Sequence, residues 1–157
     1  MNSKAENLIT ISFIKGIRTR LIEYLENLSE KQLLKIPQGF KNNIYWNIGH
    51  IVASQQGLLY RRSGLPLKVS EDFMNHFKNG TSPETWQQTF PISETKSIVS
   101  NTVNELEMDI SKEIFNAYEA FTPSLGTPIS TFDEALQYNM FHEGMHLGYI
   151  MAMKKLV

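Results

Sequence analysis

The histidines of this 157-residue chain are the side chains whose type and spacing best suit metal chemistry. His142 and His146 are four residues apart, so on a helix their Cβ atoms lie about 5–6 Å apart and both imidazoles can reach one ion. Residues 142–146 read H-E-G-M-H and match the H-E-x-x-H pattern of zinc peptidases. In those enzymes the two histidines bind the metal and the glutamate is the general base. The pattern therefore predicts two metal ligands, with Glu143 as a catalytic base.

A third ligand is needed, because a catalytic zinc ion has three protein ligands and one open position. His50, in the middle of an expected helix, is the best candidate. The alternative is three separate core histidines, but burying unpartnered imidazoles is costly. His76 lies beside Asn75 and Lys78 in an irregular segment, and we interpret it as a surface residue.

A few other side chains could belong to the site or to the core. Trp46, Tyr60 and Tyr149 could line a pocket beside the metal, although aromatic residues at helical spacing more often pack in a core. Glu113 lies near an apolar stripe and could accept a hydrogen bond from a ligand imidazole. Asn139 lies on nearly the same helix face as His142 and could bond a ligand, a substrate or a neighbouring helix.

Apolar residues at steps of three and four predict the helices that must position these side chains. The four long helices are expected at residues 3–28, 43–64, 93–121 and 131–155. Ser29 with Gln32, and Thr131 with Glu134, fit capping boxes that begin a short helix and the fourth long helix.

No convincing pair of strands is found, so we predict an all-α four-helix bundle formed by one domain, residues 1–157. The connection at residues 65–92 is too long for a tight hairpin. It is expected to hold one or two short helices and to cross the bundle or cover one end. The long helices are expected to be antiparallel.

The composition excludes several classes of function. The chain has no cysteine, which excludes disulfides, thiolate zinc sites and a cysteine nucleophile. Its formal net charge of −1 argues against nucleic acid as a partner. No apolar segment is long enough to span a membrane, and no signal-peptide cleavage pattern follows residues 8–14. We therefore expect a cytoplasmic protein without membrane or nucleic-acid partners.

The chain resembles the DinB-like superfamily, also called the DinB/YfiT-like metalloenzymes, over nearly its whole length. Residues 46–50, which read W-N-I-G-H, and residues 142–148, which read H-E-G-M-H-L-G, are the matching segments. The resemblance implies that His50, His142 and His146 form a triad for a divalent ion, zinc or nickel. Family members often have Gln where this chain has Tyr149. Glutamate after the first histidine is common in members that are not peptidases, and no substrate-binding strand is found, which disfavours a protease.

The resemblance also implies a class of activity, which is a metal-dependent transferase that uses a low-molecular-weight thiol as a small-molecule cosubstrate. Such an ion would lower the pKa of a bound thiol or water. Two alternatives stay open. One is a metal-dependent hydrolase with Glu143 as the base, and the other is a bundle that binds a metal or small ligand without catalysis.

A homodimer that packs through long helices is also expected. The face of the fourth helix that carries Met140, Met145, Met151 and Met153 has few charges. Flexible methionine side chains adapt well to such an interface.

Overall fold

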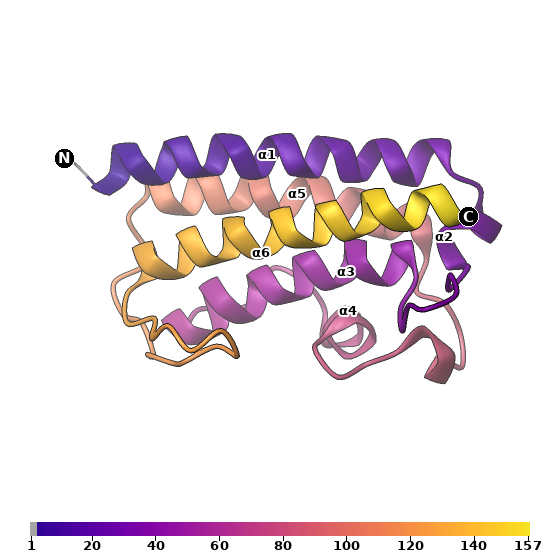
Figure 1. Cartoon of the computed structure of the whole chain (residues 1–157). Coiled ribbons are helices and arrows are strands. Elements are labelled where there is room, and N and C mark those ends of the chain that lie inside the picture. The colour runs from indigo at the N-terminus through magenta and orange to yellow at the C-terminus, as the bar shows by residue number, and fades with distance from the viewer. Residues whose placement is uncertain (1–2) are drawn as a thin grey trace.

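The computed structural model describes residues 3–157, which fold into helices joined by loops (Figure 1). The long helices are α1 (Ser3–Asn27), α3 (Ile44–Gln55), α5 (Ile92–Ser111) and α6 (Phe132–Met153), and the short ones are α2 (Glu30–Leu34) and α4 (Glu71–Phe77). A π-helical turn, Gln56–Tyr60, and a 3-10 turn, Arg61–Ser63, extend α3. Further 3-10 turns lie at Pro83–Thr85 and Lys154–Leu156. Residues 3–157 contain no strand, and Phe121 and Ile129 form one isolated bridge. The predicted all-α architecture is confirmed.

The long helices do not simply alternate in direction. In Figure 1, α1 and α6 run one way along the bundle, while α3 and α5 run the other way. The long connection from α3 to α5 lets the chain return before it enters α5, and it carries α4, which packs against α3. The expectation of four antiparallel helices is therefore correct for the pairs α1–α5 and α3–α6, but wrong for the parallel pairs α1–α6 and α3–α5.

Side-chain caps begin α2, α3 and α6, and those of α2 and α6 are the capping boxes that the sequence predicts. Ser29 and Gln32 form both bonds of a capping box at α2, and Thr131 and Glu134 form both bonds at α6. Asn43 caps α3 by accepting a hydrogen bond from the backbone N–H of Trp46 (2.7 Å). These bonds satisfy backbone donors that the first turn of a helix leaves unpaired.

The third long helix ends ten residues earlier than its apolar periodicity predicts. It stops at Ser111 because Glu113 adopts the left-handed conformation, with φ +57°, and the N–H of Ile114 bonds back to the carbonyl of Asp109 (3.3 Å). Beyond this point Phe115 stacks on Phe132, with ring centroids 3.9 Å apart. The expected helix over residues 112–121 is therefore wrong, because tertiary packing outweighs local periodicity there.

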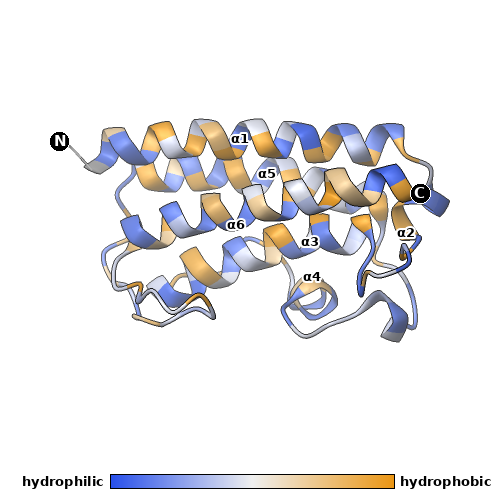
Figure 2. Ribbon diagram, in the orientation of Figure 1, coloured by the Kyte–Doolittle hydropathy of each residue, from blue (hydrophilic) through white to orange (hydrophobic). Residues whose placement is uncertain are grey.

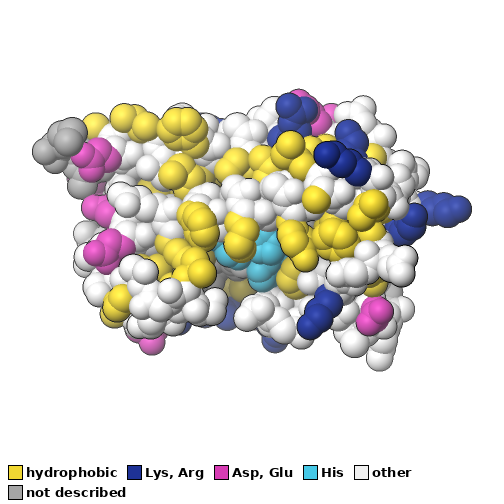
Figure 3. Space-filling view, viewed as in Figure 1, with side chains coloured by type: hydrophobic (Ala, Val, Ile, Leu, Met, Phe, Trp, Pro, Cys, Tyr) yellow, Lys and Arg dark blue, Asp and Glu magenta, His cyan; other side chains and the backbone are white. Residues whose placement is uncertain are grey.

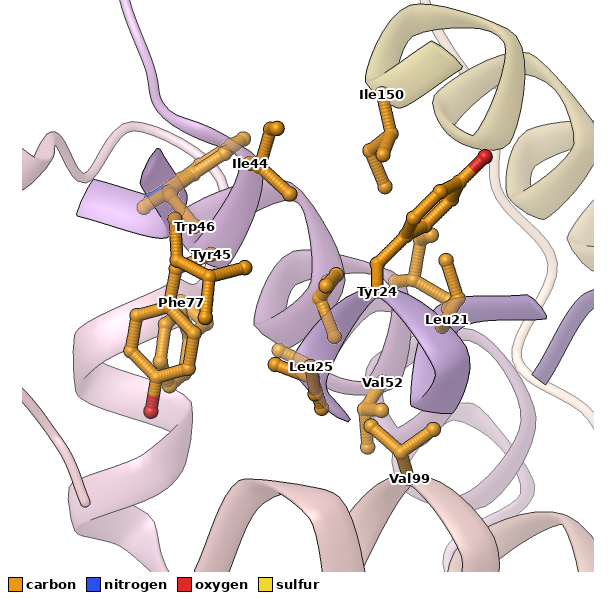
Figure 4. Packing of buried hydrophobic residues seen from close by; sticks show 14 of the residues in the cluster. Leu21, Tyr24, Leu25, Ile44, Tyr45, Trp46, Val52, Phe77, Val99 and Ile150 are labelled. Carbon is orange, nitrogen blue, oxygen red and sulfur yellow. The ribbon is translucent and has the colours of Figure 1, made fainter. Parts of the chain in front are cut away.

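The core consists of two groups of buried apolar side chains. One group joins the C-terminal halves of α1 and α6 to α3, α4 and the start of α5, and Figure 4 shows Leu25, Val52 and Val99 meeting within it. The other joins the opposite ends of α1, α5 and α6 to the π-helical turn. Apolar and polar positions accordingly alternate around each helix in Figure 2. Among the described residues, no helix is both long and apolar enough to cross a lipid bilayer.

Gly49 sets how closely α4 approaches α3. A Cβ atom at position 49 would lie 2.3 Å from a ring carbon of Phe77, a distance at which the ring must move. Phe77 is fully buried and packs edge-on against Tyr45, with ring centroids 5.5 Å apart. Glycine is therefore required at position 49 by this close contact between helices.

We predict that Gly49→Ala lowers the free energy of unfolding by about 1–3 kcal/mol, the usual cost of overpacking a core. Gly16→Ala is the matched control, because Gly16 is also inside a long helix but has nothing within 4 Å of the added Cβ. The control should raise stability by about 0.5–1 kcal/mol, since glycine destabilises a helix interior. Urea unfolding followed by circular dichroism measures both changes. Equal shifts of the two midpoints would contradict the close contact.

Candidate metal centre

The structure brings His50, His142 and His146 together between α3 and α6. One side-chain nitrogen from each ring lies within 4.8 Å of the others. The ring centroids are 5.3 Å apart for His50 and His142, 4.9 Å for His50 and His146, and 4.5 Å for His142 and His146. The sequence predicts this convergence, and the cluster could hold a metal ion.

His50 is oriented by a backbone carbonyl at the end of α4, in the connection between α3 and α5. Its Nδ1 lies 2.8 Å from the carbonyl oxygen of Phe77. Because a carbonyl can only accept, Nδ1 carries the proton and Nε2 keeps its lone pair. The Trp46 indole stacks on the imidazole, with centroids 4.4 Å apart and planes 10° apart. Gly49 allows Phe77 to come close enough for this arrangement. Nε2 of His50 therefore carries the lone pair that a metal ion could bind.

His146 is oriented by Asn47. Its Nδ1 lies 2.8 Å from Oδ1 of Asn47, while the amide nitrogen of Asn47 donates to the carbonyl of Asn43 (2.8 Å). Because the amide is held in this way, its oxygen faces His146 and accepts the Nδ1 proton. Partners of this kind fix the tautomer and ring orientation of metal-binding histidines. His146 thus also has Nε2 free.

His142 has no such partner. Its Nδ1 is buried and makes no hydrogen bond to any residue in the range 3–157. A neutral imidazole has one donor and one acceptor, so Nδ1 of His142 lacks the partner that a buried polar atom normally has. The three converging imidazoles fit a divalent ion that prefers imidazole ligands, such as zinc or nickel.

The three imidazoles are neutral at pH 7, which is the state that binds metal. Burial lowers the pKa of His142 to about 3, and repulsion from His146 and then His50 contributes to the shift. Burial, followed by repulsion from His50, lowers the pKa of His146 to about 4. The pKa of His50 is also lowered by burial, although its bond to Phe77 opposes the change.

Glu143 does not join the histidines. Its side chain is fully buried, and its two carboxylate oxygens accept hydrogen bonds from Nε (2.9 Å) and Nη2 (2.8 Å) of Arg18 on α1. Asn139 Nδ2 donates to the same carboxylate (2.8 Å). Successive residues of a helix are turned by about 100°, so Glu143 faces α1 whereas His142 and His146 face α3. The structure therefore gives no support to Glu143 as a base at the metal.

The remaining candidate residues lie elsewhere. Glu113 is exposed and pairs with Lys4 (3.5 Å), so it is not the acceptor for a ligand imidazole. Tyr60 is buried in the other core group and donates to Asp109 (2.9 Å). Tyr149 is half exposed and packs against Phe40. His76 lies in α4, with its Nδ1 2.9 Å from the backbone oxygen of Asp72, and it is outside the cluster.

Sequence reasoning missed the groups that orient the site. Asn47 could have been identified from its spacing, because it lies three residues before His50 and so shares its helix face. Arg18 could also have been identified, since it is a charged residue at a core position of the stripe Ile14, Arg18, Leu21 and Leu25. The carbonyl of Phe77 could not, because a backbone group in an irregular connection leaves no pattern of residue types.

The cluster is open on one side. In Figure 3 the histidine side chains (cyan) reach the surface between hydrophobic side chains (yellow). Ser54 borders this site, with its Oγ 3.2 Å from Nε2 of His50. Within residues 3–157 the group of potential ligands contains only the three histidines, without a carboxylate. A divalent ion bound there would keep its full charge and have room for a further ligand.

Comparison with known protein families gives a match over most of the chain. The family model described as the DinB superfamily matches residues 14–150, which include all of the metal-site histidines. No curated protein matches the sequence.

Proposed function

The chain belongs to the DinB superfamily, and we propose that it is a metal-dependent enzyme that activates a low-molecular-weight thiol for transfer to a small-molecule substrate. The observation that carries this proposal is the convergence of three neutral imidazoles at an open site. A bound divalent ion would lower the pKa of a thiol in the open position and so supply a thiolate near neutral pH.

The protein's own residues hold and shape the site. His50, His142 and His146 supply neutral ligands, and the backbone of Phe77 and the side chain of Asn47 hold two of the rings in position. Because no carboxylate joins them among the described residues, the ligands do not offset the charge of a divalent ion. Such a site favours an anionic fourth ligand, for example a thiolate. The chain contains no cysteine, so the thiol must come from a cosubstrate.

A metal-dependent hydrolase is the second candidate, and the orientation of Glu143 disfavours it. A general base must reach the water whose proton it removes, directly or through one further water. Glu143 is instead fully buried and bonded to Arg18 through both oxygens. A bundle that binds a metal without catalysis is the third candidate, and the open side of the site favours an enzyme over it.

The first test concerns the ligands. We expect the wild-type protein to bind one zinc or nickel ion per chain, and His50→Ala to weaken binding by more than the roughly 10- to 100-fold typical of losing an outer partner. Asn47→Leu should weaken metal binding by about 10- to 100-fold, because it removes only the hydrogen-bond acceptor for His146. His76→Ala is the matched control and should bind as the wild type does. Calorimetric titration measures all four proteins, and wild-type affinity in His50→Ala would refute the triad.

The second test concerns the thiol. Cobalt-loaded protein should develop a thiolate-to-metal absorption band when 2-mercaptoethanol is added. The band should reach half its height at a pH below about 8.5, the ordinary pKa of a cysteine-like thiol, because the ion stabilises the thiolate. His50→Ala should show no band. An unchanged spectrum with thiol, in cobalt-loaded protein that still binds azide, would contradict thiol activation and favour activation of water.

The third test concerns association, because we also propose that the protein is a homodimer that packs through long helices. Of the methionines expected at this interface, Met153 is fully buried in the core, whereas Met145 and Met151 are each about half exposed. Phe141 and Tyr149 of α6 are exposed to the same degree. Covering apolar side chains of this size would stabilise a dimer. Light scattering at micromolar concentration should give twice the chain mass of 18.0 kDa. A mass equal to one chain would contradict the dimer.

A further inference from the structure

Ser54 lies one helical turn after His50 on α3, and its hydroxyl is aimed at the metal site. Its Oγ is 3.2 Å from Nε2 of His50. Because the Nδ1 proton of His50 is donated to Phe77, Nε2 has only a lone pair, so the serine hydroxyl must be the donor. The hydroxyl therefore occupies, in the metal-free protein, the lone pair that a metal ion would need.

The direction of this hydroxyl is unusual for the chain. Serine and threonine side chains in helices commonly donate to the backbone carbonyl four residues earlier. Within residues 3–157, the hydroxyls of Thr10, Thr19, Thr95, Thr102 and Ser111 do so. Ser54 instead bonds to the side chain of the residue four positions earlier. Its hydroxyl points to the metal-facing nitrogen of His50 and not along the backbone.

We propose that Ser54 donates a hydrogen bond to the anionic group that occupies the open position of the metal site, and so helps to select and orient that ligand. This inference rests on the proposed metal site. When Nε2 of His50 binds an ion, it can no longer accept from Ser54, and the hydroxyl beside it needs another acceptor. An anion at the open position would attract the hydroxyl more strongly than the uncharged backbone carbonyl of His50, because hydrogen bonds to charged groups are among the stronger ones in proteins. Ser54 is then a binding residue for thiolate or hydroxide, and no ligand of the metal itself.

The test compares Ser54→Ala with Ser111→Ala, a control that removes a helical hydroxyl on α5, which bonds the carbonyl of Glu107. Cobalt affinity is measured by calorimetry, and azide affinity of the cobalt-loaded protein by its visible spectrum. Ser54→Ala should bind cobalt at least as tightly as the wild type, because no hydroxyl has to leave Nε2. It should bind azide about tenfold more weakly, the effect of losing one hydrogen bond to a charged group. Ser111→Ala should match the wild type in both measurements.

Two results would overturn the inference. Unchanged azide affinity in Ser54→Ala would show that the hydroxyl serves only the metal-free state. A loss of cobalt affinity in Ser54→Ala would show that Ser54 is itself a ligand or supports His50. Both results differ from a failure of the proposed function, in which the wild-type protein would not bind cobalt at all.

Discussion

The buried ion pair between Arg18 and Glu143 is the interaction on which the metal centre depends. Both side chains are almost completely removed from solvent, and two hydrogen bonds join them across α1 and α6. Removing one partner of such a pair typically costs about 3–5 kcal/mol, because the other charge is left buried and unpaired. The pair therefore holds the face of α6 that carries Glu143 against α1. With Glu143 held against α1, the turn of about 100° per residue directs His142 and His146 toward His50 on α3. Glu143, which the sequence pattern suggests as a catalytic base, thus binds α6 to α1 and so helps to position His142 and His146.

A series of contacts on the α3 side of the cluster orients His50 and His146. Gly49 admits Phe77 close to α3, and the carbonyl of Phe77 then fixes the tautomer of His50. Asn43 holds Asn47, which fixes His146 in the same way. The connection between α3 and α5 therefore helps to form the site, since it carries α4, and the carbonyl of Phe77 at the end of α4 orients His50. Nδ1 of His142 lacks such a partner within the described residues.

Sequence patterns predicted the parts of this protein that follow from local rules. The helix caps at Ser29 and Thr131 and the three histidines on facing helices could be derived from residue types and spacing. The end of α5 could not, because Ile114, Ala117 and Phe121 continue the apolar period while Phe115 leaves the helix to stack on Phe132. The orientation of Glu143 also depended on a distant residue, Arg18. The pattern H-E-x-x-H is compatible with a catalytic and a structural glutamate, and only the tertiary partner distinguishes them.

We infer that one divalent ion is held by His50, His142 and His146 while Glu143 stays bonded to Arg18. A crystal structure of the zinc-loaded protein, with the ion located by anomalous diffraction, tests this arrangement. We expect one ion about 2.0–2.1 Å from Nε2 of each of the three histidines, with a non-protein group in the remaining position. The Arg18–Glu143 pair should be intact in the same crystal. An ion bound elsewhere, or a Glu143 carboxylate that has left Arg18 to reach the ion or its water, would show that the inference is wrong.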